Sequence, residues 1–160
     1  MFNVSFDIYI DRISNYTAND KYDRTGHIYL GYEDPTGVYG PCSDSSERFV
    51  MMAFYDPSND TDGDIQLKAR TQSSQDWGYT SEWANVTDAY LSYDIWYAIR
   101  VEIDVSSGVY DVYVDDVLEG DDIPKYDDYT SSSIRHISFS GYQYAKGDFY
   151  VDTVSALTTY

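Results

Sequence analysis

One segment in the second half of the chain constrains the fold more than any other. Apolar and polar residues alternate through Trp96–Asp104 and again through Val109–Asp115, and Ser106-Ser107-Gly108 separates the two runs. Successive side chains of a strand point to opposite faces, so this period of two predicts an antiparallel hairpin with one buried face. The residues expected on that face are Tyr97, Ile99, Val101, Ile103, Tyr110, Val112 and Val114.

The same alternation recurs along the chain, separated by turns rich in Asp, Asn, Gly and Pro. No segment holds a helical period, and tyrosine, a residue that favours strands, is unusually frequent with 19 copies. Many short strands with turns between them predict a β-sandwich or barrel. The further strands expected are Val4–Ile10, His27–Tyr32, Arg48–Tyr55, Asp64–Arg70, Ile134–Ser140 and Phe149–Ala156.

The hairpin and the last expected strand also carry a family resemblance. Trp-Tyr-x-Ile-x-Val-x-Ile-Asp, a Ser-Gly turn and Tyr-x-Val-Tyr-Val-Asp resemble laminin G-like and glucanase-like members of the concanavalin A-like lectin/glucanase superfamily, and Phe149–Val154 resembles its closing strand. The resemblance implies an all-β, two-sheet antiparallel jelly-roll sandwich, with residues 1–160 as one domain. That family usually has a strand before Val4–Ile10, so an open sheet edge is expected there.

The charge limits the partners. With 28 acidic and 10 basic residues the net charge is −18, which repels phosphate backbones and anionic lipid. We therefore expect no nucleic-acid partner, and the absence of a long apolar run predicts no membrane insertion. The alternative is that the acidic charge serves only to keep the protein soluble.

Four of the five asparagines open an Asn-x-Ser/Thr sequon, which favours an exported glycoprotein. The expected location is extracellular or at the cell surface, in a domain excised from a longer exported protein. The alternative is that asparagine and threonine simply share turns. The four predicted glycosylation sites are Asn3, Asn15, Asn59 and Asn85.

Two catalytic patterns were considered, and no catalytic residue is assigned. Glu102-x-Asp104 resembles the paired carboxylates of glucanases, but serine stands where the second catalytic glutamate would be, and serine is no general acid at neutral pH. Polysaccharide lyases of this fold use Tyr with His and Arg or Gln on the concave sheet. His136 with Tyr142, Gln143 and Tyr144 is the best such group, and His27 is the other histidine.

Carboxylates in two places make a structural Ca²⁺ plausible. Asp60 and Asp62 lie in the acidic loop Asp56–Gly63, where oxygen ligands could gather, although the loop matches the calcium template weakly and an acidic hairpin turn is the alternative. Asp152 in the expected closing strand resembles the residue that holds a structural Ca²⁺ in glucanase-type relatives.

Aromatic residues in polar segments predict a glycan site, because sugar rings stack on indole and phenol faces. Trp77, Tyr79 and Trp83 lie in such a segment, and Tyr142 and Tyr144 form a second pair. The alternative is a loop that folds back to cap the sandwich.

The leading hypothesis is a non-catalytic, lectin-like module that binds a polysaccharide or other glycan. The first alternative is a structural surface protein (an adhesin, sheath or fibre subunit) that assembles with copies of itself or with neighbouring domains through strand edges. The second is a polysaccharide lyase or glycoside hydrolase.

Overall fold

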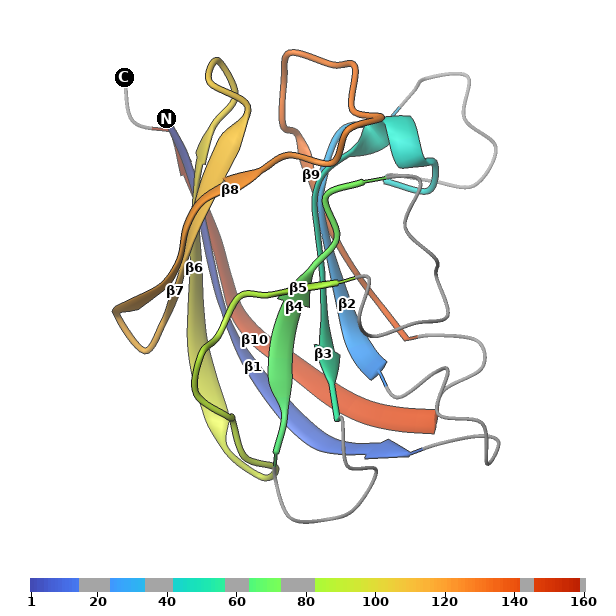
Figure 1. Ribbon diagram of the computed structural model, residues 1–160, viewed down its shortest axis with the longest axis vertical. Coiled ribbons are helices and arrows are strands. Elements are labelled where there is room, and N and C mark those ends of the chain that lie inside the picture. Colours follow the sequence, from blue (N-terminus) through green and yellow to red (C-terminus); the bar gives the residue numbers. More distant parts are fainter. Residues whose placement is uncertain (15–23, 34–41, 57–63, 73–82, 142–145, 159–160) are drawn as a thin grey trace.

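The chain forms a two-sheet antiparallel jelly-roll sandwich, as predicted. The computed structural model describes residues 1–14, 24–33, 42–56, 64–72, 83–141 and 146–158. Figure 1 shows the two sheets packed face to face. The elements are β1 (Phe2–Ser14), β2 (Arg24–Gly31), η1 (Ser45–Glu47), β3 (Arg48–Tyr55), β4 (Gln66–Ala69), β5 (Ala84–Asn85), β6 (Trp96–Asp104), β7 (Val109–Val114), β8 (Val117–Pro124), β9 (His136–Ser140) and β10 (Lys146–Thr158).

The first sheet has the order β10-β1-β6-β7-β8 and contains the predicted hairpin. Ile99 pairs with Val114, Val101 with Val112 and Ile103 with Tyr110, in the expected register. These pairs are buried against the second sheet, so the predicted apolar face is the core face. In this sheet β1 is paired on both sides, with β10 and with β6, so the open edge expected at the first strand is absent among the described residues.

The second sheet has the order β5-β4-β3-β2-β9, and its inner strands β2 and β3 are buried on both faces. From β3, Val50, Met52 and Phe54 enter the main core between the sheets. Met51, Ala53 and Tyr55 alternate with them and point the other way, into a smaller cluster that also contains Trp83 and Tyr126. This second cluster lies on the outer side of the sandwich and positions the candidate site.

Two strands were not predicted. β8 follows β7 through a turn at Asp115 and Asp116, which both have positive φ (49° and 64°), as a type I′ hairpin turn requires. β5 is two residues long and pairs with Lys68 and Ala69 of β4. Among the described residues, no helix is long and apolar enough to cross a membrane.

Candidate functional site

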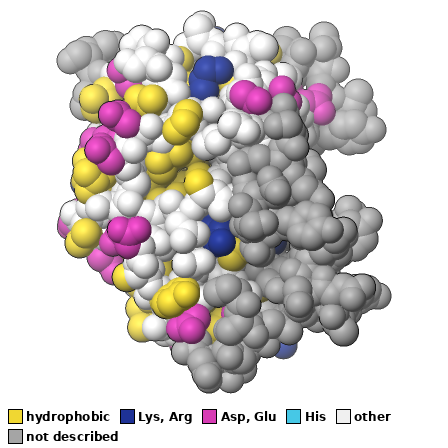
Figure 2. All heavy atoms as spheres, viewed as in Figure 1, with side chains coloured by type: hydrophobic (Ala, Val, Ile, Leu, Met, Phe, Trp, Pro, Cys, Tyr) yellow, Lys and Arg dark blue, Asp and Glu magenta, His cyan; other side chains and the backbone are white. Residues whose placement is uncertain are grey.

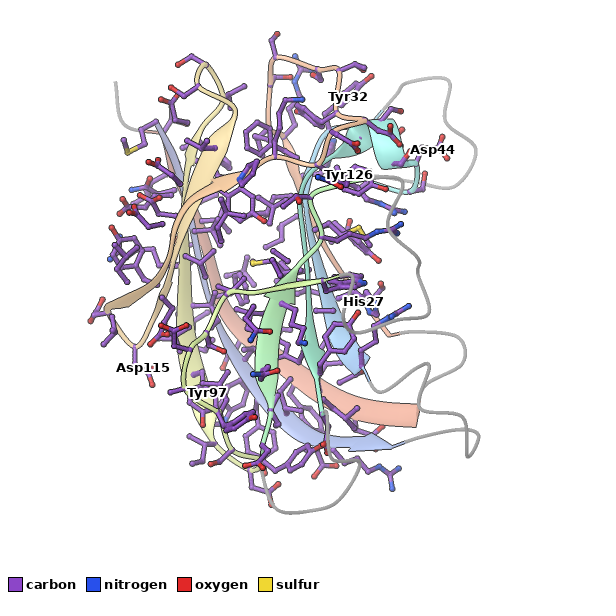
Figure 3. All side chains as sticks on the ribbon, viewed as in Figure 1. His27, Tyr32, Asp44, Tyr97, Asp115 and Tyr126 are labelled. Atoms are coloured by element: carbon purple, nitrogen blue, oxygen red, sulfur yellow. The ribbon has the colours of Figure 1, made fainter. Side chains whose placement is uncertain are left out.

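The outer side of the second sheet carries a cluster of basic and aromatic side chains, which we call the basic face. Its aromatic members pack together: the Tyr55 and Trp83 ring centroids are 5.3 Å apart, and Tyr126 belongs to the same cluster. Figure 3 shows His27 pointing away from the first sheet, toward this outer side. The basic face consists of Arg24, His27, Tyr29, Arg48, Tyr55, Lys68, Arg70, Trp83 and Tyr126.

Strand register brings these residues together from distant parts of the sequence. Arg24 of β2 is the partner of Tyr55 in β3, and its Nη1 donates a hydrogen bond of 3.0 Å to the Tyr55 Oη. Lys68 lies opposite Ala53, and its Nζ is 5.4 Å from the centre of the Tyr55 ring. The Arg24 guanidinium carbon is 5.4 Å from the Trp83 ring centre, within the range of a cation–π contact. Every cation thus has an aromatic surface beside it.

Most residues of the basic face are buried, and two are partly exposed to solvent. Arg24, His27, Tyr55 and Arg70 are at most 1% exposed. Tyr29 and Arg48 are partly exposed, and the Arg48 guanidinium carbon lies 4.6 Å from the Tyr29 ring centre. Arg48 is held in place because its Nε donates to the Cys42 carbonyl at 2.9 Å and its Nη2 to the Ser43 carbonyl. This stacked pair is the part of the basic face that a ligand would reach first.

The positive charges of the basic face act on one another. Burial, together with the smaller effects of the nearby Arg24 and Arg48, lowers the pKa of His27 to about 3, so the imidazole is neutral at physiological pH. Burial lowers the pKa of Arg70 as well, while Arg24 and Arg48 add repulsion and Tyr126 opposes the shift. In a chain with a net charge of −18, this concentration of positive charge favours an anionic ligand.

Of the predicted glycan-binding residues, only Trp83 lies among the described residues. It is 3% exposed and belongs to the basic face, with its ring 6.3 Å from His27. Its indole N–H has no hydrogen-bond acceptor among the described residues. Trp77, Tyr79, Tyr142 and Tyr144 lie outside the described residues.

Of the predicted lyase group, only His136 lies among the described residues, because Tyr142, Gln143 and Tyr144 lie outside them. His136 is on β9, at the edge of the second sheet, where its Nε2 is 3.9 Å from a Glu33 carboxylate oxygen. His27 instead lies on the basic face with Tyr55 and Arg24. Sequence reasoning missed the arginines of this face. The available signal was that Lys68 and Arg70 alternate with the core residues Leu67 and Ala69 on a short strand.

The glucanase-like carboxylates serve the hairpin and its turn. Asp104 accepts hydrogen bonds from the hydroxyl groups of Ser106 at 2.5 Å and Ser107 at 2.6 Å, which lower the pKa of its carboxyl group far below the ordinary range. Glu102 pairs with Arg100, whose guanidinium lies 3.6 Å from the Tyr113 ring centre. A carboxylate held ionised in this way is a poor proton donor.

A set of three acidic residues beside this region could hold a metal ion. Asp111, Asp121 and Asp122 offer carboxylate oxygens within 4.8 Å of one another. Of the predicted metal ligands, Asp152 is exposed on β10 and paired with Asp7 of β1, while Asp60 and Asp62 lie outside the described residues.

The predicted glycosylation sites differ in exposure. Asn85 is exposed on the edge strand β5, whereas Asn3 of β1 is partly buried, and its Oδ1 has no hydrogen-bond donor among the described residues. Asn15 and Asn59 lie outside the described residues.

No family model and no curated protein matches this chain, so the comparisons rest on solved structures. A sialidase is similar with a TM-score of 0.57 and 15% identity over 99% of this chain and 13% of its own. Domain 4 of an extracellular GH43 arabinanase from Geobacillus stearothermophilus, in complex with arabinotriose, has a TM-score of 0.45 and 17% identity over 97% of this chain and 59% of its own. A marine PL7 alginate lyase from Zobellia galactanivorans has a TM-score of 0.49 and 12% identity over 98% of this chain and 61% of its own.

At such low identity the likeness to the sialidase concerns the fold alone. The two structures with TM-scores below 0.5 add nothing further. This chain spans less than two thirds of the length of each of the three. The β-sandwich therefore has independent structural support, while the chemistry of the site has to be argued from the chain's own residues.

Proposed function

We propose that this domain binds an anionic glycan on the basic face, as a non-catalytic module of an extracellular or cell-surface protein. The observation that carries the proposal is the gathering of Arg24, Arg48, Lys68 and Arg70, four of the ten basic residues, on one side of one sheet. A glycan ligand also agrees with the carbohydrate-directed name of the similar sialidase.

The chemistry of the partly exposed pair fits a uronate or a sulfated sugar. Arg48 can bond a carboxylate or sulfate. The Tyr29 ring lies under the Arg48 guanidinium and stacks on His27 with centroids 6.0 Å apart, so it offers a sugar its edge and hydroxyl group. Arg24 and Arg70, buried behind this pair, raise the local positive potential. A charge-assisted hydrogen bond to the Arg48 guanidinium is stronger for an anionic oxygen than for a neutral one, which gives the interaction a reason to be specific for charge.

Affinity electrophoresis and calorimetry test this proposal with alginate and polygalacturonate as anionic polymers. The wild-type domain should bind at least one of them at about 50 mM salt and lose most of that affinity at about 500 mM, since salt screens partly exposed charges. Arg48→Ala should weaken binding about tenfold or more. Arg135→Ala removes an exposed charge outside the basic face and is the matched control.

Two results would overturn the proposal. One is the absence of binding to any anionic polymer at low salt. The other is an equal loss of affinity in the Arg48 and Arg135 variants, which would mean that only net charge matters. Because Arg48 also bonds two backbone carbonyl groups, the melting temperature of each variant has to be measured alongside. Arg48→Lys, which keeps the charge but loses the planar fork, should give an intermediate affinity.

One observation favours a second candidate function, the β-elimination of a uronate polymer. Arg24 donates to the Tyr55 hydroxyl, and the neutral His27 is on the same face. These are the residue types that lyases of this fold use, according to the resemblance. Tyr55 could take the proton next to the carboxyl group as the C4–O4 bond breaks and return it to the leaving oxygen. His27, a weak base because its pKa is about 3, could donate a hydrogen bond to the substrate carboxylate.

Binding without catalysis remains the leading proposal because His27 and Tyr55 are both buried. A reaction would require a uronate to reach them, whereas binding requires access only to Tyr29 and Arg48. Absorbance of the unsaturated product separates the two functions. A lyase would give product that Tyr55→Phe and His27→Gln abolish, and a binding module would retain the polymer and give none.

The acidic trio on β7 and β8 supports a separate structural proposal, a Ca²⁺ site. Asp111, Asp121 and Asp122 supply the oxygen ligands that Ca²⁺ prefers. Calcium should raise the melting temperature relative to EDTA, and Asp121→Asn should remove that difference. No calcium effect on the wild-type protein would count against the site.

A further inference from the structure

Three aromatic residues form a row across the outer side of the first sheet. Tyr9 of β1 is paired with Tyr150 of β10 on one side and with Trp96 of β6 on the other. The ring centroids of Tyr9 and Trp96 are 5.4 Å apart, and those of Tyr9 and Tyr150 are 5.8 Å apart. We call these three residues the outer row. It lies on the opposite side of the sandwich from the basic face.

Two of the three residues of the outer row are exposed although they are large and partly apolar, and Tyr9 between them is partly exposed. Trp96 is 49% and Tyr150 55% exposed, which is unusual for neighbouring aromatic side chains that could pack in a core. Contiguous exposed aromatic surface is typical of a binding site. Core packing is already supplied by the alternate residues of the same strands, such as Ile8 and Ile10, so the outer row has no part in it.

A turn before β6 fixes the position of Trp96 against β1. The backbone N–H of Asp94 donates to the Ile10 carbonyl at 3.0 Å, and the Tyr9 hydroxyl donates to the Asp94 carboxylate at 3.0 Å. In the same turn, the backbone N–H of Ser92 donates to the Tyr97 hydroxyl at 2.7 Å. These bonds hold the Tyr9 ring and the backbone that leads into Trp96 in place before any ligand arrives, which lowers the entropic cost of binding.

Carboxylates surround the outer row. Asp94 accepts a hydrogen bond from Tyr9. Two residues further along the strands, Asp7 lies opposite Asp152. Asp148 forms an ion pair with Arg12 at 2.9 Å. Figure 2 shows hydrophobic and acidic side chains interspersed along the left side of the molecule, where the first sheet lies. Such a surface repels anionic polymers and a second copy of a chain with a net charge of −18. It offers hydrogen-bond acceptors to a ligand rich in hydroxyl groups.

We propose that the outer row is a second glycan site, which takes a neutral polysaccharide chain by stacking sugar rings on Trp96, Tyr9 and Tyr150. The rings are tilted relative to one another, by 47° for Tyr9 and Trp96 and by 65° for Tyr9 and Tyr150. This stepped arrangement fits successive sugars of a single chain rather than a flat crystalline surface. The site does not depend on the basic face and differs from it in charge.

Affinity electrophoresis on hydroxyethyl cellulose, galactomannan and debranched arabinan tests the inference. The wild-type domain should be retarded by at least one of these neutral polymers, and the retardation should persist at high salt. Trp96→Ala and Tyr150→Ala should each weaken binding at least about fivefold, and the double variant should abolish it. Tyr90→Ala, which removes a ring that is 56% exposed outside the outer row, is the matched control.

Several results would overturn this inference. One is that none of the three neutral polymers retards the domain. Another is that the wild type and the Trp96–Tyr150 double variant are retarded equally. A third is that Tyr90→Ala loses as much affinity as Trp96→Ala. A dimer in light scattering that Trp96→Ala converts to monomer would assign the row to self-association instead. Arg48→Ala should leave neutral binding unchanged, so failure here is distinguishable from failure of the basic face.

Discussion

The outer sides of the two sheets use the same aromatic residue types and differ in charge and burial. On the second sheet, Tyr55 and Trp83 are buried beside arginine and lysine side chains. On the first sheet, Trp96 and Tyr150 are exposed among aspartates. Tyrosine alone therefore does not decide whether a sheet face is core or surface. Whether an outer face is buried depends on the residues that alternate with the core residues along each strand and on the segments that cover those residues.

The strand patterns explain this difference. In β6 and β7 buried and accessible residues alternate, as expected for a sheet with one face in the core. In β3 every residue after Arg48 is buried, so both faces of the second sheet are covered. A buried cation requires aromatic and hydrogen-bonding neighbours, and Arg24 has both in Tyr55. Four measurements test this difference between the two sides of the sandwich.

The largest expected effect is the loss of a buried ring from the basic face. Tyr55→Ala should lower the free energy of unfolding by about 3–5 kcal/mol, since it leaves a cavity and removes the hydroxyl that Arg24 bonds. Tyr150→Ala, the exposed counterpart, should change it by less than about 0.5 kcal/mol. Urea unfolding measures both values. Similar losses in the two variants would refute the contrast in burial.

The second largest effect is expected at Gly31, whose backbone lies close to that of Glu47, the residue before Arg48. A Cβ atom on Gly31 would lie 1.7 Å from the Glu47 carbonyl oxygen, so Gly31→Ala must displace backbone beside Arg48. We expect a loss of about 1–3 kcal/mol in stability and weaker binding of anionic polymers, with neutral binding unchanged. Gly141→Ala is the control because no atom of the described residues lies within 4 Å of its Cβ position. Equal stability of the two variants would contradict this packing.

The third measurement concerns pH. The pKa of His27 is about 3 in the folded protein and about 6.5 when unfolded, so the unfolded state binds more protons between these values. Stability should therefore fall as pH decreases below 6.5, and His27 should contribute about 2 kcal/mol of loss between pH 7 and pH 5. His27→Gln should remove that component, which urea unfolding at the two pH values would measure. His136→Gln is the control, and a wild-type pH dependence retained by the His27 variant would contradict the burial.

The smallest effect is expected at the rim of the outer row. Arg12 and Asp148 form an ion pair whose side chains are 64% and 51% exposed. Exposed pairs contribute little, so Arg12→Ala should change stability by less than about 0.5 kcal/mol in thermal unfolding. A loss above about 1 kcal/mol would mean that this margin is more rigid than its exposure indicates.

The sequence was sufficient to predict the sandwich and most of its strands. Arg48–Tyr55 and Trp96–Asp104 match the observed bounds because apolar residues mark them throughout. β8 was missed because it contains Glu119, Gly120, Asp121 and Asp122, which are rare in strands, and because its turn uses Asp115-Asp116 without the usual glycine.

Neither of the two proposed glycan-binding surfaces could be predicted as a whole. Arg24, Arg48 and Arg70 are far apart in the sequence, and only the register of β2, β3 and β4 brings them to one face. The outer row has the same origin, since Tyr9 meets Tyr150 and Trp96 through pairings that alternation does not specify. Alternation identifies the face on which a side chain lies, whereas its neighbours across the sheet depend on topology.

The most direct test of the basic face is to map binding by backbone amide chemical shifts. Titration of the isotopically labelled domain with an oligouronate should perturb β2, β3 and β4, with the largest changes around Tyr29 and Arg48, and the changes should diminish in high salt. Perturbations confined to β1, β6 and β10, or no perturbation at millimolar oligouronate and low salt, would contradict the proposed anionic glycan site.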